Sequence, residues 1–163
     1  MSGLKVLEPT SIQFTRNLGV SDSSNEIWED TEKIRAHFAE SVTFNPILRI
    51  LEGLLKARED SSMDNWDSYG AKATDTNSFR YAIHFALSLP WDIPIPDIYI
   101  NPEGYVTYEW YEGKRNVYSV ITGNRGELAY AGLYGSSKAY GTEYMYEEIP
   151  ETIINNIYRL YLE

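Results

Sequence analysis

Short turn sequences divide the second half of the chain, and this feature limits its possible folds more than any other. The turns at 102–104, 112–114 and 123–126 contain glycine, proline or asparagine. They separate four segments rich in β-branched and aromatic residues, namely 97–101, 105–111, 116–122 and 127–134. Connections this short join neighbouring strands as hairpins, so the sequence predicts an antiparallel meander of about four strands. After a further turn at 135–138, residues 139–146 are expected to form a last short strand or a loop.

Side chains alternate between the two faces of such a sheet. In the segment 105–111 one face carries Val106, Tyr108 and Trp110, and the other carries Thr107, Glu109 and Tyr111. The first face suits packing against helices, whereas the second would meet water or a partner. We expect that second face to show Glu109, Tyr111, Tyr118 and Tyr130 or their alternates.

Helical patterns lie on both sides of the predicted sheet. Residues 26–41 have amphipathic spacing, and 46–60 form a wide apolar stripe that starts at Asn-Pro, a helix-start signal. Further helices are predicted from 75 or 76 to the Leu-Pro pair at 89–90 and from 150 to the C-terminus. Separate helices packed on one face of an antiparallel sheet define the α+β class. Residues 1–25 are expected to be a flexible or partly ordered arm, and 26–163 a single α+β domain.

Charge and composition exclude several functions. The 163 residues include 24 Asp and Glu against 14 Lys and Arg, a formal net charge of −10, and no cysteine. Because the positive residues do not cluster along the sequence, direct nucleic-acid binding is not expected. The lack of cysteine excludes disulfides, thiol catalysis and cysteine-held metals. Neither a bilayer-spanning run nor a signal sequence is evident, so we expect a cytoplasmic protein with no membrane partner. No cofactor is expected either.

A series of short motifs runs in order from about residue 64 to residue 161. The motifs are Trp66-Asp67-Ser68-Tyr69-Gly70-Ala71, Leu89-Pro90, Ile95-Pro96-Asp97, Glu109-Trp110, Tyr130-Ala131-Gly132-Leu133-Tyr134-Gly135, Gly141-Thr142-Glu143 and Ile149-Pro150. This series resembles a family of small uncharacterised bacterial proteins. The resemblance implies a bacterial or phage-related origin and no particular activity, cofactor or catalytic residue. It also implies glycine at the position where this chain has Ser68.

The two histidines have no evident catalytic or metal-binding partners. His37 and Glu40 would share one helix face, but a zinc site needs three or four protein ligands and no third is suggested. His84 lies between Ile83 and Phe85 of an apolar helix, which favours a packing role. No residue is therefore predicted to bind a metal.

Two carboxylates lie beside tryptophans in a way that suits sugar chemistry. Asp67 follows Trp66, and Glu109 precedes Trp110. Glycosidases use two carboxyl groups about 5–9 Å apart, and a tryptophan ring can stack on a sugar. A small hydrolase that uses Asp67, Glu109 or His84 is therefore kept as an alternative.

The loop at 64–71 has two interpretations. In the structural one, Trp66 anchors the loop to the core, Asp67 accepts hydrogen bonds from backbone amides, and Gly70 takes a positive φ. In the functional one, Trp66 and Tyr69 contact a partner, since both residue types are enriched at binding hot spots.

An acidic, tyrosine-containing stretch lies near the C-terminus, with no Lys or Arg between 138 and 159. Aromatic side chains provide contact area, and carboxylates steer a basic partner towards the surface. The alternative is an ordinary solvated face. The predicted contact residues come from the loop at 64–71, from the predicted sheet and from this acidic stretch. They are Trp66, Tyr69, Glu109, Glu143, Tyr144, Tyr146, Glu147 and Glu148.

These patterns favour a non-enzymatic acidic module that binds a protein with a basic surface, such as a nuclease or a nucleic-acid-binding complex. Inhibitors of the antitoxin, immunity or phage anti-defence type act in this way. Besides the hydrolase, a structural subunit whose exposed tyrosines form a homodimer stays open.

Overall fold

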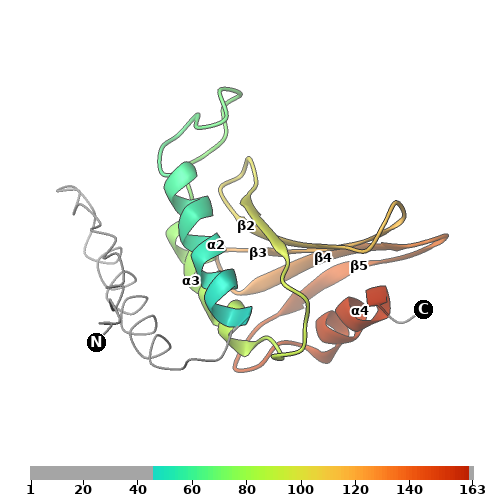
Figure 1. Ribbon diagram of the computed structural model, residues 1–163. Helices are drawn as coiled ribbons and strands as arrows, with labels where there is room; N and C mark the ends of the chain where they lie inside the picture. The colour runs from blue at the N-terminus through green and yellow to red at the C-terminus, as the bar shows by residue number, and fades with distance from the viewer. Residues whose placement is uncertain (1–45, 162–163) are drawn as a thin grey trace, which may run out of the picture.

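The computed structural model describes residues 46–161, which form three helices packed on one sheet (Figure 1). The helices are α2 (Pro46–Asp60), α3 (Thr76–Ser88) and α4 (Glu151–Tyr161), and the strands are β1 (Asp97–Ile100), β2 (Val106–Tyr111), β3 (Asn116–Thr122), β4 (Glu127–Tyr134) and β5 (Ser137–Tyr144). All neighbouring strands are antiparallel, and they lie in chain order from β1 to β5. The predicted α+β class and meander are therefore confirmed.

Within the described residues the sheet has five strands, one more than the expected number of about four. β5 pairs with β4 over its whole length, from Ser137 opposite Tyr134 to Tyr144 opposite Glu127. Only two residues form the turn between these strands, and the first of them, Gly135, has a φ of 60°, a left-handed conformation that favours glycine. The glycine- and serine-rich sequence at 135–138 therefore contains both a turn and the start of a strand.

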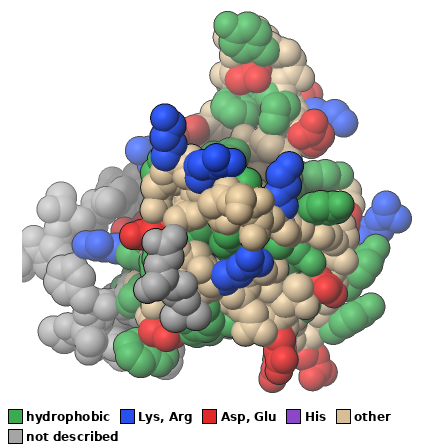
Figure 2. Space-filling view, turned by 90° about the vertical axis from the view of Figure 1, so that its right-hand side faces the viewer, with side chains coloured by type: hydrophobic (Ala, Val, Ile, Leu, Met, Phe, Trp, Pro, Cys, Tyr) green, Lys and Arg blue, Asp and Glu red, His purple; other side chains and the backbone are tan. Residues whose placement is uncertain are grey.

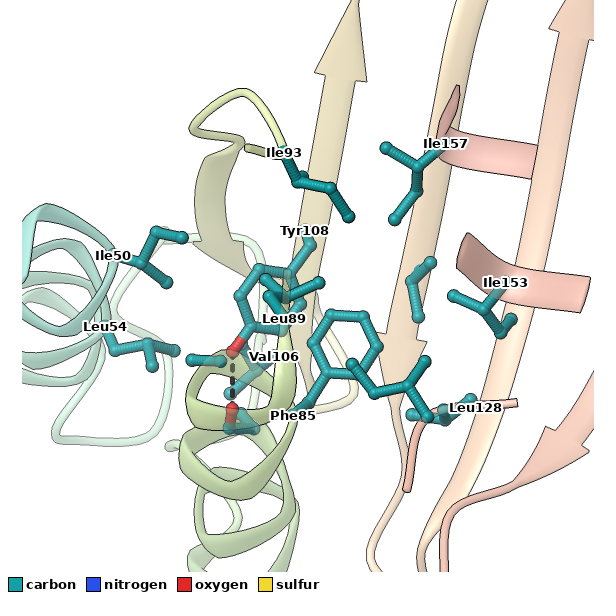
Figure 3. Close-up of a cluster of buried hydrophobic side chains, with 14 of the residues drawn as sticks. Ile50, Leu54, Phe85, Leu89, Ile93, Val106, Tyr108, Leu128, Ile153 and Ile157 are labelled. Atoms are coloured by element: carbon teal, nitrogen blue, oxygen red, sulfur yellow. Dashed lines mark hydrogen bonds between the residues drawn. The ribbon is translucent and has the colours of Figure 1, made fainter. Parts of the chain in front are cut away.

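One face of the sheet, the inner face, carries the hydrophobic core (Figure 3). Leu54 of α2, Phe85 of α3 and Ile153 of α4 are fully buried in one cluster with Tyr108 of β2. The hydroxyl of Tyr108 donates a hydrogen bond to the carbonyl oxygen of Ala82 at 2.7 Å, shown as a dashed line in Figure 3. The even-numbered residues of β2 are buried in this core, as their alternation predicts.

Tyr118 and Tyr130 belong to the inner face, so they do not share the opposite face with Glu109 and Tyr111. Tyr118 lies opposite Trp110 and is fully buried, and Tyr130 packs partly buried against the same core. Alternation within one strand can be derived from the sequence. Which residue of the next strand stands opposite depends on where the turn ends, and the sequence does not show that position.

Helix α3 begins where the sequence predicts and is bonded to the sheet by one side chain. Asp75 is its N-cap, and its carboxylate accepts a hydrogen bond from the N–H of Ser78 at 2.8 Å. The hydroxyl of Ser78 accepts from the N–H of Val106 at 3.0 Å and donates to the carbonyl oxygen of Thr122 at 2.6 Å. Since Val106 and Thr122 stand opposite each other in β2 and β3, this one hydroxyl joins α3 to both strands.

The arm predicted at 1–25, the helix predicted at 26–41 and His37 lie outside the described residues. Between residues 46 and 161, no helix is both long enough and apolar enough to cross a membrane.

Candidate functional site: the outer face of the sheet

The surface of the sheet that points away from the core is called the outer face here. Helices α2, α3 and α4 all pack on the inner face and leave the outer face uncovered (Figure 1). The strand register places the residues of the outer face in rows across the sheet. The rows are Tyr99, Thr107, Ile121, Ala129 and Thr142; Asp97, Glu109, Ser119, Ala131 and Tyr140; Tyr111, Val117, Leu133 and Lys138; and Glu127 with Tyr144.

Four exposed tyrosines stand around the margin of the outer face. Tyr99 on β1 is 43% exposed, Tyr111 on β2 is 61% exposed, and Tyr140 and Tyr144 on β5 are 80% and 53% exposed. Tyrosine combines apolar area with a hydroxyl and loses little conformational entropy on binding. The middle of the face holds shorter, partly buried apolar residues, namely Val117, Ile121, Ala129 and Leu133.

The charges of the outer face are mainly negative. The phenol of Tyr99 donates a 3.3 Å hydrogen bond to Oε2 of Glu109. Partial burial, together with the nearby charge of Glu109, raises the pKa of Tyr99. Glu127 turns back to the neighbouring turn, where its Oε2 accepts from the N–H of Arg125 at 2.8 Å. Asp97 and Glu109 are the other acidic residues of the face, and Lys138 is the one cation in its rows from β1 to β5, so the local charge of these rows matches cationic groups.

A buried hydroxyl lies within the outer face. Thr107 is only 2% exposed, although it stands on this side of β2 between Tyr99 and Ile121. Its Oγ1 has no hydrogen-bond partner among the described residues. Buried hydroxyls are normally bonded, so an unbonded hydroxyl at this position is expected to lower the stability of the sheet.

The loop between α2 and α3 has the predicted hydrogen bonds. Oδ1 of Asp67 accepts from the N–H of Tyr69 at 2.8 Å and from that of Ala71 at 3.0 Å, and these bonds lower the pKa of Asp67. Gly70 has a φ of 95°, as expected for a positive-φ glycine, and Ser68 has a φ of 65°. The resemblance implies glycine at Ser68, and a left-handed backbone there gives such a preference a physical reason.

The prediction that Trp66 anchors this loop in the core is wrong. Trp66 is 38% exposed, and its Nε1 donates to the carbonyl oxygen of Lys72 at 3.0 Å, which bonds the indole to the loop itself. The small side chain of Ala71 is buried instead, and Tyr69 is 93% exposed. The motif therefore forms an exposed loop that stabilises its own conformation.

The predicted contact residues do not form one surface. The α2–α3 loop, with its tryptophan and tyrosine, lies at the top of Figure 1, whereas the connection from β5 to α4 lies at the bottom. Glu143 points to the inner face opposite Leu128, but its neighbour Tyr144 points to the outer face. Of the eight residues, Glu109 and Tyr144 share the outer face. Tyr146, Glu147 and Glu148 are exposed in the connection.

The candidate hydrolase residues are not brought together. Glu109 lies on the outer face, while α3, which carries His84, packs on the inner face. His84 is exposed and not packed in the core, and Oδ1 of Asp67 is engaged by backbone amides. Trp110 is buried, with its Nε1 donating to the carbonyl oxygen of Pro94 at 2.7 Å, so it is not available to stack on a sugar. From residue 46 to 161, no three potential metal-binding side chains converge.

Cationic side chains that are scattered along the sequence meet at one end of the sheet. The N–H of Gly135 in the β4–β5 turn donates to the carbonyl oxygen of Arg115 at 2.9 Å, which joins this turn to the β2–β3 turn. Lys114 precedes Arg115, and Lys138 follows the β4–β5 turn as the second residue of β5. The meander therefore places Lys114, Arg115 and Lys138 at the same end of the sheet.

Helix α4 adds a fourth cation to this end. The guanidinium of Arg159 lies 4.3 Å from the ring centre of Tyr134, the last residue of β4. Figure 2 faces this side of the molecule and shows Lys and Arg side chains gathered near its middle. Lys114, Arg115, Lys138 and Arg159 are called the basic end below. Sequence reading missed this cluster because only the strand register brings these residues together.

Comparison of the chain with known protein families, with curated proteins and with solved structures gives no match.

Proposed function

We propose that this chain is a non-catalytic protein-binding module that uses the outer face of its sheet. The observation that carries the proposal is a five-stranded face, uncovered by α2, α3 and α4, with four exposed tyrosines at its margin. Large exposed patches of this kind on soluble proteins usually mark interaction sites. The rows of short apolar residues between the tyrosines would form the centre of the contact, with the phenols as anchors.

The partner we propose is a protein with a basic surface. Asp97 and Glu109 give the outer face its negative charge, and the whole chain carries a net charge of −10. Such a charge speeds the encounter with a cationic partner and disfavours anionic ones. An inhibitor that covers the basic surface of a nuclease or of a nucleic-acid-binding complex, in the cytoplasm of a bacterium, has this chemistry.

Site-specific photo-crosslinking tests the proposal. A photoreactive phenylalanine is placed at Tyr99 or at Tyr111 on the outer face, and at Trp91 as the control. Trp91 is 81% exposed and lies in the α3–β1 connector, next to Asp92, which accepts a 2.8 Å hydrogen bond from Tyr158 of α4. The control is therefore an exposed aromatic residue on the helix side. We expect both outer-face positions to capture the same basic protein in cells and Trp91 to capture none of it.

Binding of the captured protein to purified variants then measures the contribution of each group. Tyr111→Ala is expected to weaken binding by roughly tenfold to a hundredfold, the range of an interface anchor, with Trp91→Ala unchanged. Glu109→Lys is expected to slow association more at low salt than at high salt, and Glu52→Lys on the exposed side of α2 serves as its charge-matched control. Equal crosslinking from all three positions, or equal effects of Glu109→Lys and Glu52→Lys, would refute the proposed surface.

A further inference from the structure

β5 is an edge strand whose second side has no strand partner among residues 46–161. The N–H of Met145 donates to the carbonyl oxygen of Gly126 at 2.9 Å, so the backbone groups of residue 145 point towards β4. These directions alternate along an antiparallel strand. The N–H and C=O groups of Lys138, Tyr140, Thr142 and Tyr144 therefore point away from the sheet.

This free edge lacks most of the features that normally protect one. It is eight residues long, has no proline, and carries two exposed tyrosines, Tyr140 and Tyr144. Natural edge strands are usually short, bulged, charged or covered, because unpaired backbone groups can bind another strand. The charged residues of β5 are Lys138 and Glu143, each next to one end of the strand, and its middle is otherwise suited to accept a further strand.

The charges along β5 indicate which strand fits. Its first residues adjoin the basic end, with Lys138 in the strand itself. Its last residues adjoin four carboxylates, namely Glu143 in the strand, Glu147 and Glu148 in the connection to α4, and Glu151 at the start of α4. A strand that binds antiparallel to β5 with matching charges must therefore be cationic at its start and anionic at its end, and β5 itself has this order.

We propose that β5 binds β5 of a second copy of this chain, antiparallel across a two-fold axis. Each basic end then lies beside the carboxylates that follow β5 in the other copy, and the same contact is made twice, as in an isologous dimer. Residues with outward backbone groups must face one another, and in the two registers with the greatest overlap of the strands Tyr140 stands opposite Tyr140 or opposite Thr142. Either register keeps the outer faces on one side, and two five-stranded sheets become one continuous sheet.

Thr142→Pro tests this dimer directly. The N–H of residue 142 points away from β4, so proline there removes no hydrogen bond between β4 and β5, and prolines are tolerated on edge strands in this orientation. Thr142→Ala keeps the N–H and is the matched control. By sedimentation equilibrium, we expect the wild type and Thr142→Ala to reach twice the chain mass of 18.7 kDa, and Thr142→Pro to raise the dimer dissociation constant by at least about tenfold.

Two further variants keep the test decisive if Thr142→Pro does not fold. Tyr140→Lys retains the backbone and places like charges together at the two-fold axis, so it is expected to weaken the dimer. Lys138→Glu replaces the one cation of β5 with a carboxylate and is expected to do the same, whereas Lys72→Glu, in the exposed α2–α3 loop, changes the net charge equally and should not.

Hydrogen exchange locates the contact. In the dimer, the amides of residues 138, 140, 142 and 144 are expected to be protected, and dilution should remove that protection. A wild type that stays monomeric at every concentration overturns the inference, and so does a dimer unaffected by Tyr140→Lys and Lys138→Glu. The dimer and the proposed function can fail separately. If the chain proves to be a monomer, its outer face can still bind a partner. Conversely, Tyr111→Ala should weaken partner binding without changing the dimer.

Discussion

Ser78→Ala tests whether a single buried hydroxyl holds α3 to the sheet. Ser78 is fully buried and bonds both to the N–H of Val106 and to the carbonyl oxygen of Thr122. Without the hydroxyl, both backbone groups lose this partner in a site that water does not reach. Each such loss costs roughly 1–3 kcal/mol, and alanine returns about 0.5 kcal/mol through its higher helix propensity. The two losses less this gain lower the free energy of unfolding by about 1.5–5.5 kcal/mol.

The matched control is Ser88→Ala in the last turn of the same helix. The hydroxyl of Ser88 donates to the carbonyl oxygen of His84 at 2.9 Å, but this bond is exposed and water can replace it. The change at Ser88 should therefore stay within about 0.5 kcal/mol. Urea unfolding followed by tryptophan fluorescence gives both free energies by linear extrapolation. A loss at Ser78 below about 1 kcal/mol, or no larger than that at Ser88, would refute the role of the bridging hydroxyl.

Three further predictions follow from other features of the structure. Thr107→Val removes an unpartnered buried hydroxyl and should raise the free energy of unfolding by about 1 kcal/mol; a decrease in urea unfolding would show that the hydroxyl is bonded. Ser68→Gly relieves a left-handed backbone at a φ of 65° and should stabilise the chain by up to about 1 kcal/mol, which a lowered Tm would contradict. Burial raises the pKa of Tyr108 and Tyr118, and it raises that of Tyr134 to about 12. Because these phenols hold their protons more tightly in the folded state, their contribution to stability should be fully present below pH 10 and be lost as the pH rises towards 12. Absorbance titration of the folded chain should show them ionising well above pH 10, and ionisation near pH 10 would contradict this.

The features of the fold that depend on local chemistry could be predicted from the sequence. Turn residues, the Asn-Pro helix start and the alternation within β2 each act over a few positions, and each predicted the observed element. The start of β5 was not predicted, because serine suits both a turn and an edge strand. The sequence also does not predict the face of the sheet to which Tyr118 points, since this depends on its pairing with a residue of another strand.

The candidate site was predictable only in part, for the same reason. Glu109 and Tyr144 were expected as contact residues, and both lie on the outer face. The segment around Glu143 was treated as one patch, but neighbouring residues of a strand point to opposite faces, so its carboxylate and the next phenol lie on different sides. One of the two interpretations of the loop at 64–71 makes Trp66 an anchor to the core, whereas its indole donates to a backbone carbonyl of its own loop.

The charge of −10 predicted repulsion of anions over the whole surface, and the fold changes that expectation locally. The meander returns to the same end of the sheet after β2 and after β4, and the cations of both turns collect there with Arg159. The last strand then runs away from these cations towards Glu143 and the carboxylates that follow. A strand that joins β5 therefore meets opposite charges at its two ends, and only one orientation satisfies both. In the proposed dimer, this asymmetry sets the antiparallel direction in which β5 of the second copy must run.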